Sequence, residues 1–268
     1  MQHAAQIKRL LGGFAIRRPR VSSYVPAHPH HLEAAYVASL HRRVSGPLAA
    51  ITWQALQPWL ARYRGPNERT DADDDFLTAI GHAQLRFAER VDIDAEATAA
   101  PARMAPQVEA FSAVQQRVML RVLGVNPIGD NILLYNAQQA WLADNTARIN
   151  LLPQTYWSDL QNHVSQAVHS GMRHETLARE LAVKHESLAG WPSERLARDQ
   201  VSKYNGRLAQ AQQTAVGVET YQWRAIGDAR TRPEHLALDM SIQRWDSPPS
   251  IGNPGEPILC RCSACAMI

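Results

Sequence analysis

Apolar residues recur every three or four positions along most of the first 215 residues, which is the spacing of one face of an α-helix. This spacing predicts helices over 31–43, 48–64, 107–123, 129–149, 156–168, 174–185 and 197–215, separated by glycines and prolines such as Gly46-Pro47 and Pro153. A further helix, capped by Asp71 or Asp73, is predicted from the stripe Leu77, Ile80, Gln84, Phe87 and Val91. In the helix 107–123 the predicted buried stripe is Val108, Phe111, Val114, Val118 and Val122.

The pattern changes after Gly217, where residues 219–225 alternate in the manner of a β-strand. From Gly227 onward turn residues and prolines predict short strands and ordered loops. The fold class is therefore α+β and predominantly α-helical. We expect an N-terminal arm (1–28), a helical region (29–150), and a domain (151–268) in which a helical lead-in precedes a small β-containing end.

Composition excludes several classes of protein. Of the 268 residues 45% are hydrophobic and 20% are charged, which is typical of globular chains. No apolar run approaches the roughly 18 residues of a membrane-spanning helix, so no membrane partner is expected. All three cysteines lie in the last nine residues and cannot form a disulfide framework through the fold, which favours synthesis in a cytoplasm.

The charge distribution marks the N-terminus. Net charge is only +3, yet residues 1–28 contain no acidic residue. Such a basic arm can contact DNA phosphates non-specifically or an acidic protein surface, and a solvated terminus is an equally good interpretation. Its basic residues are Lys8, Arg9, Arg17, Arg18 and Arg20.

The densest polar cluster follows the predicted strand and consists of Asp228, Arg230, Arg232, His235 and Asp239. One interpretation is a structural knot, in which Asp228 accepts hydrogen bonds from Arg230 or Arg232 and His235 bonds to backbone. Another is a phosphodiester- or nucleotide-directed enzyme, in which both arginines hold a phosphate and His235 acts as acid or base. Because no nucleophile or second carboxylate pair is evident, the structural knot is favoured and no catalytic residue is assigned.

Cys260, Cys262 and Cys265 allow two interpretations. Thiolates at this spacing fit a structural zinc site whose fourth ligand is His235 or Asp228. Alternatively, the cysteines are small, soft residues that fill the core at the end of the fold. The second interpretation is favoured, so no cofactor is expected.

Several short motifs occur in a fixed order through this part of the chain: Ala197-Arg198-Asp199-Gln200, Tyr204-Asn205-Gly206-Arg207-Leu208, Gly217-Val218, Tyr221-x-Trp223-Arg224, Asp228-x-Arg230-x-Arg232-x-x-His235, Leu238-Asp239, Trp245-Asp246, Pro254-Gly255-x-Pro257 and Cys260-Arg261-Cys262. Together they resemble the C-terminal domain of the phage Mu F-like head morphogenesis family, with a lead-in that extends the resemblance to about residues 150–265. Family members usually carry glycine after Leu-Asp, where this chain has Met240.

The resemblance implies a non-enzymatic minor head (capsid) protein that acts in head morphogenesis. Such a protein is expected in the phage virion head, at the portal or the inner capsid, where it aids DNA packaging or delivery. The implied partners are the portal protein, the major capsid protein or scaffold proteins. The enzyme that uses His235 with Arg230 and Arg232 is the alternative.

Overall fold

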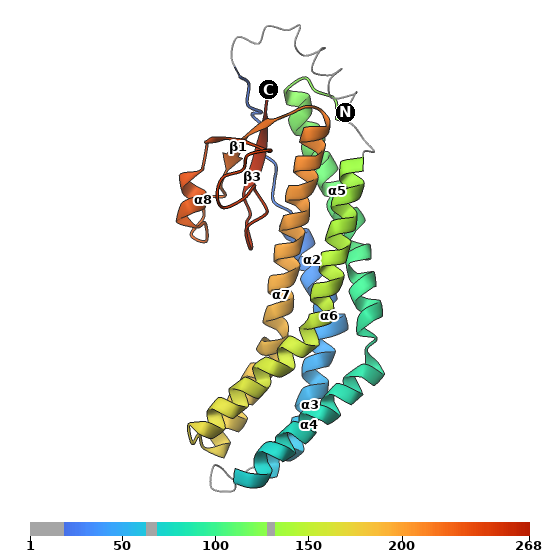
Figure 1. Cartoon of the computed structure of the whole chain (residues 1–268), viewed down its shortest axis with the longest axis vertical. Helices are drawn as coiled ribbons and strands as arrows, with labels where there is room; N and C mark the ends of the chain where they lie inside the picture. Colours follow the sequence, from blue (N-terminus) through green and yellow to red (C-terminus); the bar gives the residue numbers. More distant parts are fainter. Residues whose placement is uncertain (1–18, 63–68, 128–131) are drawn as a thin grey trace. The chain divides into compact units, whose positions relative to one another are not determined.

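A computed structural model describes residues 19–62, 69–127 and 132–268 (Figure 1). It confirms a predominantly α-helical α+β fold with one small antiparallel sheet. The elements are α2 (His30–Leu40), the π-helix η1 (His41–Ser45), α3 (Gly46–Arg62), α4 (Arg69–Arg90), α5 (Ile93–Val122), α6 (Ile132–His169), α7 (His174–Ala215), β1 (Thr220–Arg224), α8 (Pro233–Ala237), β2 (Ile242–Arg244) and β3 (Ser263–Met267). None of the helices among the described residues is both long and apolar enough to cross a bilayer.

The chain divides into two compact units, neither of which is continuous in sequence. The sheet unit comprises residues 1–34, 102–143 and 198–268, and the helical unit comprises 35–101 and 144–197. The boundaries fall inside α2, α5, α6 and α7, so each of these helices contributes to both units.

The helices are longer than the sequence pattern predicted. Pro153 lies inside the 38-residue α6, and Pro192 lies inside the 42-residue α7. A proline removes one backbone hydrogen bond and crowds the preceding turn. In the helical unit, buried residues such as Tyr156, Leu160 and Ala189 surround these positions, and their packing offsets that local cost.

Gly46-Pro47 also fails to separate two helices as predicted, because the turn before it widens into η1. The N–H of Gly46 donates to the carbonyl oxygen of His41, five residues back. A Cβ at position 46 would lie 2.7 Å from that oxygen, so the close approach requires glycine. The π-turn therefore lets the chain pass from α2 into α3 without a loop.

Helix α5 begins at Ile93, well before the predicted start at 107, and it buries only part of the predicted stripe, since Val108 is buried and Phe111 is half-buried. Val114, Val118 and Val122 are exposed, although the pattern predicted them to be buried. Met119 and Leu120 are buried instead, in a cluster with Val216 and Val218, which lie between α7 and β1, and with Ala266 of β3. Apolar residues recur at helical spacing on both faces of α5, so periodicity alone could not select the buried one.

In the helical unit, buried residues of α3, α4, α6 and α7 form one core. Its aromatic members include Trp59, which contacts Phe76, and Phe87, whose ring meets that of Trp157 edge to face. This core explains why these four helices hold together without strands.

In the sheet unit, buried polar contacts join three helices. The ring of Trp141 on α6 stacks on Tyr204 of α7, and its indole N–H donates to the carbonyl oxygen of Gln200. The hydroxyl of Tyr204 donates to Glu109 on α5. Burial and this carboxylate together raise the pKa of Tyr204 above its usual range. The C-terminal part of α7 is thereby fixed to its neighbours.

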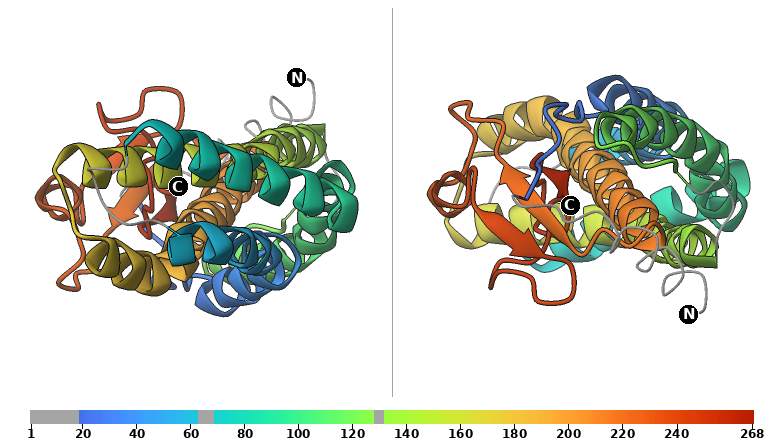
Figure 2. Two further views of the ribbon diagram at one scale, coloured as in Figure 1. Left: turned by 90° about the horizontal axis from the view of Figure 1, so that it is seen from below. Right: turned by 90° about the horizontal axis from the view of Figure 1, so that it is seen from above.

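The sheet has the order β2-β1-β3, with β1 antiparallel to both neighbours. In β1, Tyr221 and Trp223 point into the core, as the predicted alternation requires. Figure 2 shows β1 and β3 beside the C-terminal part of α7, with the blue segment after residue 18 next to β3. In that segment Val21 forms a β-bridge with Met267, and the backbones of Arg20 and Ile268 exchange two hydrogen bonds.

The loop 253–256 approaches α7 more closely than any side chain would allow. A Cβ at Gly206 would lie 2.5 Å from the carbonyl oxygen of Pro254, and a Cβ at Gly255 would lie 2.9 Å from that of Ser202. Gly255 also has a φ of 92°, which favours glycine. The two glycines therefore allow direct backbone contact between α7 and the segment that leads to Cys260.

Replacing Gly206 by alanine should destabilise the protein by about 1–3 kcal/mol, because backbone atoms must move to admit the methyl group. Gly190 in the same helix is the matched control, since a Cβ there meets nothing within 4 Å. Gly190→Ala should increase stability by up to about 1 kcal/mol through helix propensity. Chemical denaturation measures the free energy of unfolding of both variants. Equal effects of the two substitutions would contradict the close contact at Gly206.

Candidate functional site

The polar run after β1 begins with a turn built on Asp228. Its carboxylate accepts hydrogen bonds from the backbone N–H of Arg230 and the hydroxyl of Thr231. Arg261 donates two further hydrogen bonds to it, each of 2.7 Å. The Arg261 guanidinium holds the pKa of Asp228 well below its usual range. The structural-knot interpretation is thus met only in part: Arg230 binds Asp228 through its backbone N–H, whereas the ion-pair partner of Asp228 is Arg261.

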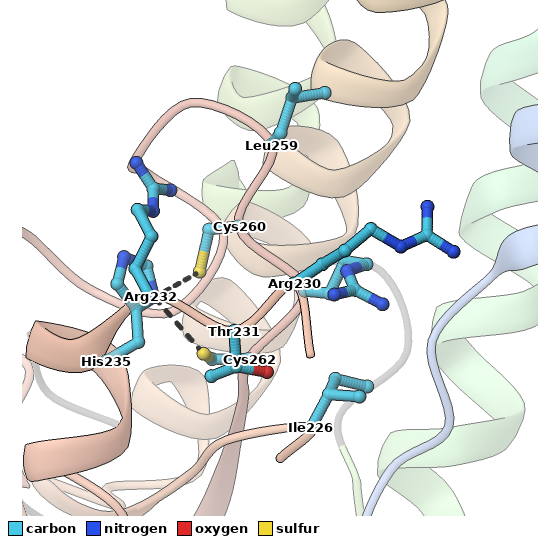
Figure 3. A pocket seen from close by; sticks show the side chains of 9 residues that line it. Ile226, Arg230, Thr231, Arg232, His235, Leu259, Cys260 and Cys262 are labelled. Atoms are coloured by element: carbon cyan, nitrogen blue, oxygen red, sulfur yellow. Dashed lines mark hydrogen bonds between the residues drawn. The ribbon is translucent and has the colours of Figure 1, made fainter. Parts of the chain in front are cut away.

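The other members of the predicted knot bind elsewhere. Arg232 donates from Nη2 to the carbonyl oxygen of Ile258 at 2.5 Å. Asp239 accepts from the backbone N–H of Ala225 and lies 3.6 Å from Arg224. The guanidinium of Arg230 extends away from the neighbouring sulfur atoms (Figure 3). The polar side chains that follow β1 therefore form separate contacts and not one cluster. Two of these contacts, from Asp228 and from Arg232, hold the segment 258–261.

The imidazole of His235 faces the sulfur atoms of both Cys260 and Cys262 (Figure 3). It is carried by the short helix α8, and its Nδ1 atom lies 3.3 Å from the sulfur of Cys262 and 3.6 Å from that of Cys260. His235 is 3% exposed and Cys260 is 2% exposed. Trp223 of β1 meets the imidazole edge to face. The structure thus brings together three of the five residues that the sequence named as candidate zinc ligands.

Cys260 and Cys262 lie two residues apart in the segment that leads into β3, and both sulfurs face the imidazole. Arg261, between them, binds Asp228 instead. Cys265 lies further along, in β3, where its sulfur faces the carbonyl oxygen of Tyr24. It does not take part in the group around His235.

The two thiols have different protonation properties. Hydrogen bonds from Cys262 and from the N–H of Gly255 lower the pKa of Cys260 to about 6. The neighbouring Cys260 sulfur and burial raise the pKa of Cys262. Of the two sulfurs, that of Cys260 is therefore the one whose surroundings favour the thiolate.

A small pocket adjoins this group. His235, Cys260 and Cys262 line it together with Arg230, Arg232 and Arg261, and its volume is about 20 Å³. This volume holds roughly one water molecule. The buried imidazole faces two sulfurs, so the geometry does not favour the phosphodiester- or nucleotide-directed enzyme.

Of the basic residues predicted to contact DNA or a partner, Lys8, Arg9, Arg17 and Arg18 lie outside the described residues. Arg20 is exposed, although its backbone is bound to Ile268. The side chain of Gln115 on α5 binds the hydroxyl of Tyr24 and the N–H of Ala27. The described end of the arm is therefore held against the sheet unit.

Two residues that hold the cysteine segment were missed as site residues. Arg261 binds Asp228, and Asp199 of α7 accepts a hydrogen bond of 2.8 Å from the N–H of Leu259. Both lie in the motifs quoted above, but their partners are 33 and 60 residues away in sequence. Local sequence patterns do not reveal such contacts, so only information that links positions far apart in the sequence could have identified Arg261 and Asp199.

Met240 occupies the position at which glycine was expected. Its φ is 64°, so the turn keeps the left-handed conformation that glycine adopts without cost. The N–H of Met240 donates to the carbonyl oxygen of Trp223, which holds the turn in place. A methionine at this φ carries local strain that a glycine would not.

Residues 158–265 match the family described as Phage Mu protein F like protein. The resemblance seen in the sequence is confirmed over this stretch. The match supports a phage head-morphogenesis protein, and Asp199, Gly206, Asp228, His235, Cys260 and Cys262 all lie within this Mu F-like region.

An uncharacterized protein of Haemophilus influenzae is 35% identical to the chain over 127 residues. The aligned part covers 46% of this chain and 28% of the relative, so the chain spans under a third of that protein. No solved structure matches the chain.

The Asp228–Arg261 pair should make the stability of the Mu F-like region depend on pH. The pKa of Asp228 is lowered in the folded chain, so the unfolded chain takes up a proton first as the pH falls. The stabilisation is present above about pH 4 and is lost as the pH falls below it. Denaturation at pH 7 and at pH 3 measures the fall in the free energy of unfolding between the two. This fall should be smaller for Asp228→Asn than for the unaltered chain. An equal fall would contradict a stabilising contribution of the Asp228–Arg261 pair.

Replacing Met240 by glycine should stabilise the protein by about 0.5–1 kcal/mol, because relief of left-handed strain exceeds the added entropy of the unfolded chain. The Met240 side chain is 54% exposed, so little packing is lost. Met240→Ala keeps the strain and is the matched control. Thermal unfolding distinguishes the two variants, and a gain shared by alanine would show that the backbone is not the cause.

Proposed function

We propose that this protein is a minor head protein that binds at the portal or the inner capsid surface during phage head morphogenesis. The observation that carries the proposal is the Mu F-like match over residues 158–265. The partners follow from the family resemblance and are the portal protein, the major capsid protein or scaffold proteins. The proposed location is the virion head.

The contacts within the Mu F-like region support a structural role. Asp228, Arg232 and Asp239 each bind a group of the same unit, and two of these ties secure the segment that carries the cysteines. The adjoining pocket has a volume of only about 20 Å³. Side chains that are engaged in this way stabilise a fixed surface, and a non-enzymatic role is accordingly part of the proposal.

The basic arm is the proposed DNA contact. Lys8, Arg9, Arg17, Arg18 and Arg20 carry five positive charges with no acidic residue among the first 28 positions. Contacts with about five phosphates give an affinity that is non-specific and falls steeply with salt. Such contacts suit a protein that lies against packaged DNA and that aids DNA packaging or delivery.

Co-expression with the portal and capsid proteins of the same phage tests the proposal. The full chain should sediment with portal oligomers or procapsids, and phage that lack the gene should form defective heads or lose infectivity. Cross-linking mass spectrometry would identify the partner surface. Normal heads and full infectivity without the protein would refute the proposal.

A variant with alanine at Lys8, Arg9, Arg17, Arg18 and Arg20 separates the two proposed contacts. It should still sediment with the portal or procapsid and should lose most binding to DNA at low salt. The control is Gly190→Ala, which leaves the arm intact. Unchanged DNA binding by the arm variant would remove the DNA contact and leave the assembly role standing.

A further inference from the structure

One nitrogen atom and two sulfur atoms of the sheet unit, from His235, Cys260 and Cys262, lie close together. Hydrogen bonding alone does not account for this arrangement. The Nδ1 atom of His235 is 3.3 Å from one sulfur and 3.6 Å from the other. A single ring nitrogen carries at most one hydrogen, so it can donate to only one sulfur at a time. Both sulfurs nevertheless face the same atom, and all three lie within 4.8 Å of one another.

These separations match the edges of a metal coordination shell. With Zn–S bonds of about 2.3 Å and Zn–N bonds of about 2.0–2.1 Å, tetrahedral ligands have N···S distances of about 3.6 Å and S···S distances of about 3.8 Å. We propose that His235, Cys260 and Cys262 bind one zinc ion. The proposal does not depend on the role in head assembly.

The donor set and its surroundings favour zinc. Imidazole and thiolate are the ligands that zinc takes in structural sites. Two thiolates neutralise the doubly charged ion, so the loaded site adds no net charge beside Arg230, Arg232 and Arg261, which line the adjoining pocket. Burial of His235 and Cys260 keeps competing water from most of the site.

The surrounding fold already positions the ligands. The Gly206–Gly255 contact and the Asp199–Leu259 hydrogen bond fix the start of the cysteine segment on α7. Arg232 joins the beginning of α8, which carries His235, to Ile258. Ligands held in this way lose little entropy when the ion binds.

A fourth ligand completes the tetrahedron. Cys265 and Asp228 were the other ligands that the sequence suggested, but Asp228 is bound by Arg261, and Cys265 faces Tyr24. The pocket beside the three donors has room for one water molecule. Water is therefore the proposed fourth ligand, and the ion joins α8 to the segment that enters β3.

Metal analysis of the untagged full chain, expressed with added zinc and purified without chelator, tests the proposal. It should carry about one zinc ion per chain. Replacement of the zinc by Co²⁺ should produce thiolate-to-cobalt charge-transfer absorption together with the visible bands of a tetrahedral site. Chelation should lower the melting temperature, and added Zn²⁺ should restore it. These measurements need no variant to fold.

Variants then locate the ion. His235→Ala and the double variant Cys260→Ser/Cys262→Ser should lose zinc, whereas Cys265→Ser should retain it. A second group of donors, His28, His30 and Glu33, also lies within reach of a common ion. His30→Ala tests that group and should leave the zinc content unchanged.

Several results would overturn the proposal. These are a chain free of zinc that also shows no cobalt charge transfer, a metal other than zinc in the purified protein, and zinc that persists in the double cysteine variant. Loss of zinc in His30→Ala alone would assign the metal to the N-terminal group instead.

Discussion

The arrangement of the Mu F-like region depends on one steric constraint, the contact between the backbones of α7 and the loop 253–256. Gly206 and Gly255 allow it because neither has a Cβ, and any side chain at either position would meet a carbonyl oxygen. The cysteine segment starts a few residues later, so its position follows from this contact. A helix-interior glycine, unfavourable for the helix itself, is thus retained for tertiary packing.

Buried polar side chains of α7 then connect the same helix to the sheet. Asp199 receives the N–H of Leu259 and the ammonium group of Lys203. Gln213 donates to Gln116 on α5 and to the carbonyl oxygen of Ala264, and it accepts from the indole of Trp245. Because an unpaired buried polar group is costly, these bonds specify one arrangement of helix, loop and strand.

Sequence reasoning succeeded where the relevant interactions are local. The alternation after Gly217 gave strand β1, and the spacing from Ala197 to Ala215 gave the end of α7. It failed at Pro153 and Pro192, which were expected to separate helices but lie inside α6 and α7, because long-range packing outweighs the local effect of proline. It also failed in α5, which is apolar on two faces, so that Val118 is exposed and Met119 is buried. In the site, the residue types of His235, Cys260 and Cys262 suggested metal ligands, but their proximity could not be predicted.

The sequence by itself determined the helical character of the chain, the small β-containing end and the family resemblance, because these depend on periodicity and on ordered short motifs. Only the tertiary structure decided the partners: Arg261 for Asp228, Ile258 for Arg232, and the two sulfurs for His235. The physical reason is that each of these contacts spans more than 20 residues and follows from the close approach of α7 to the loop that precedes Cys260, which no local pattern encodes.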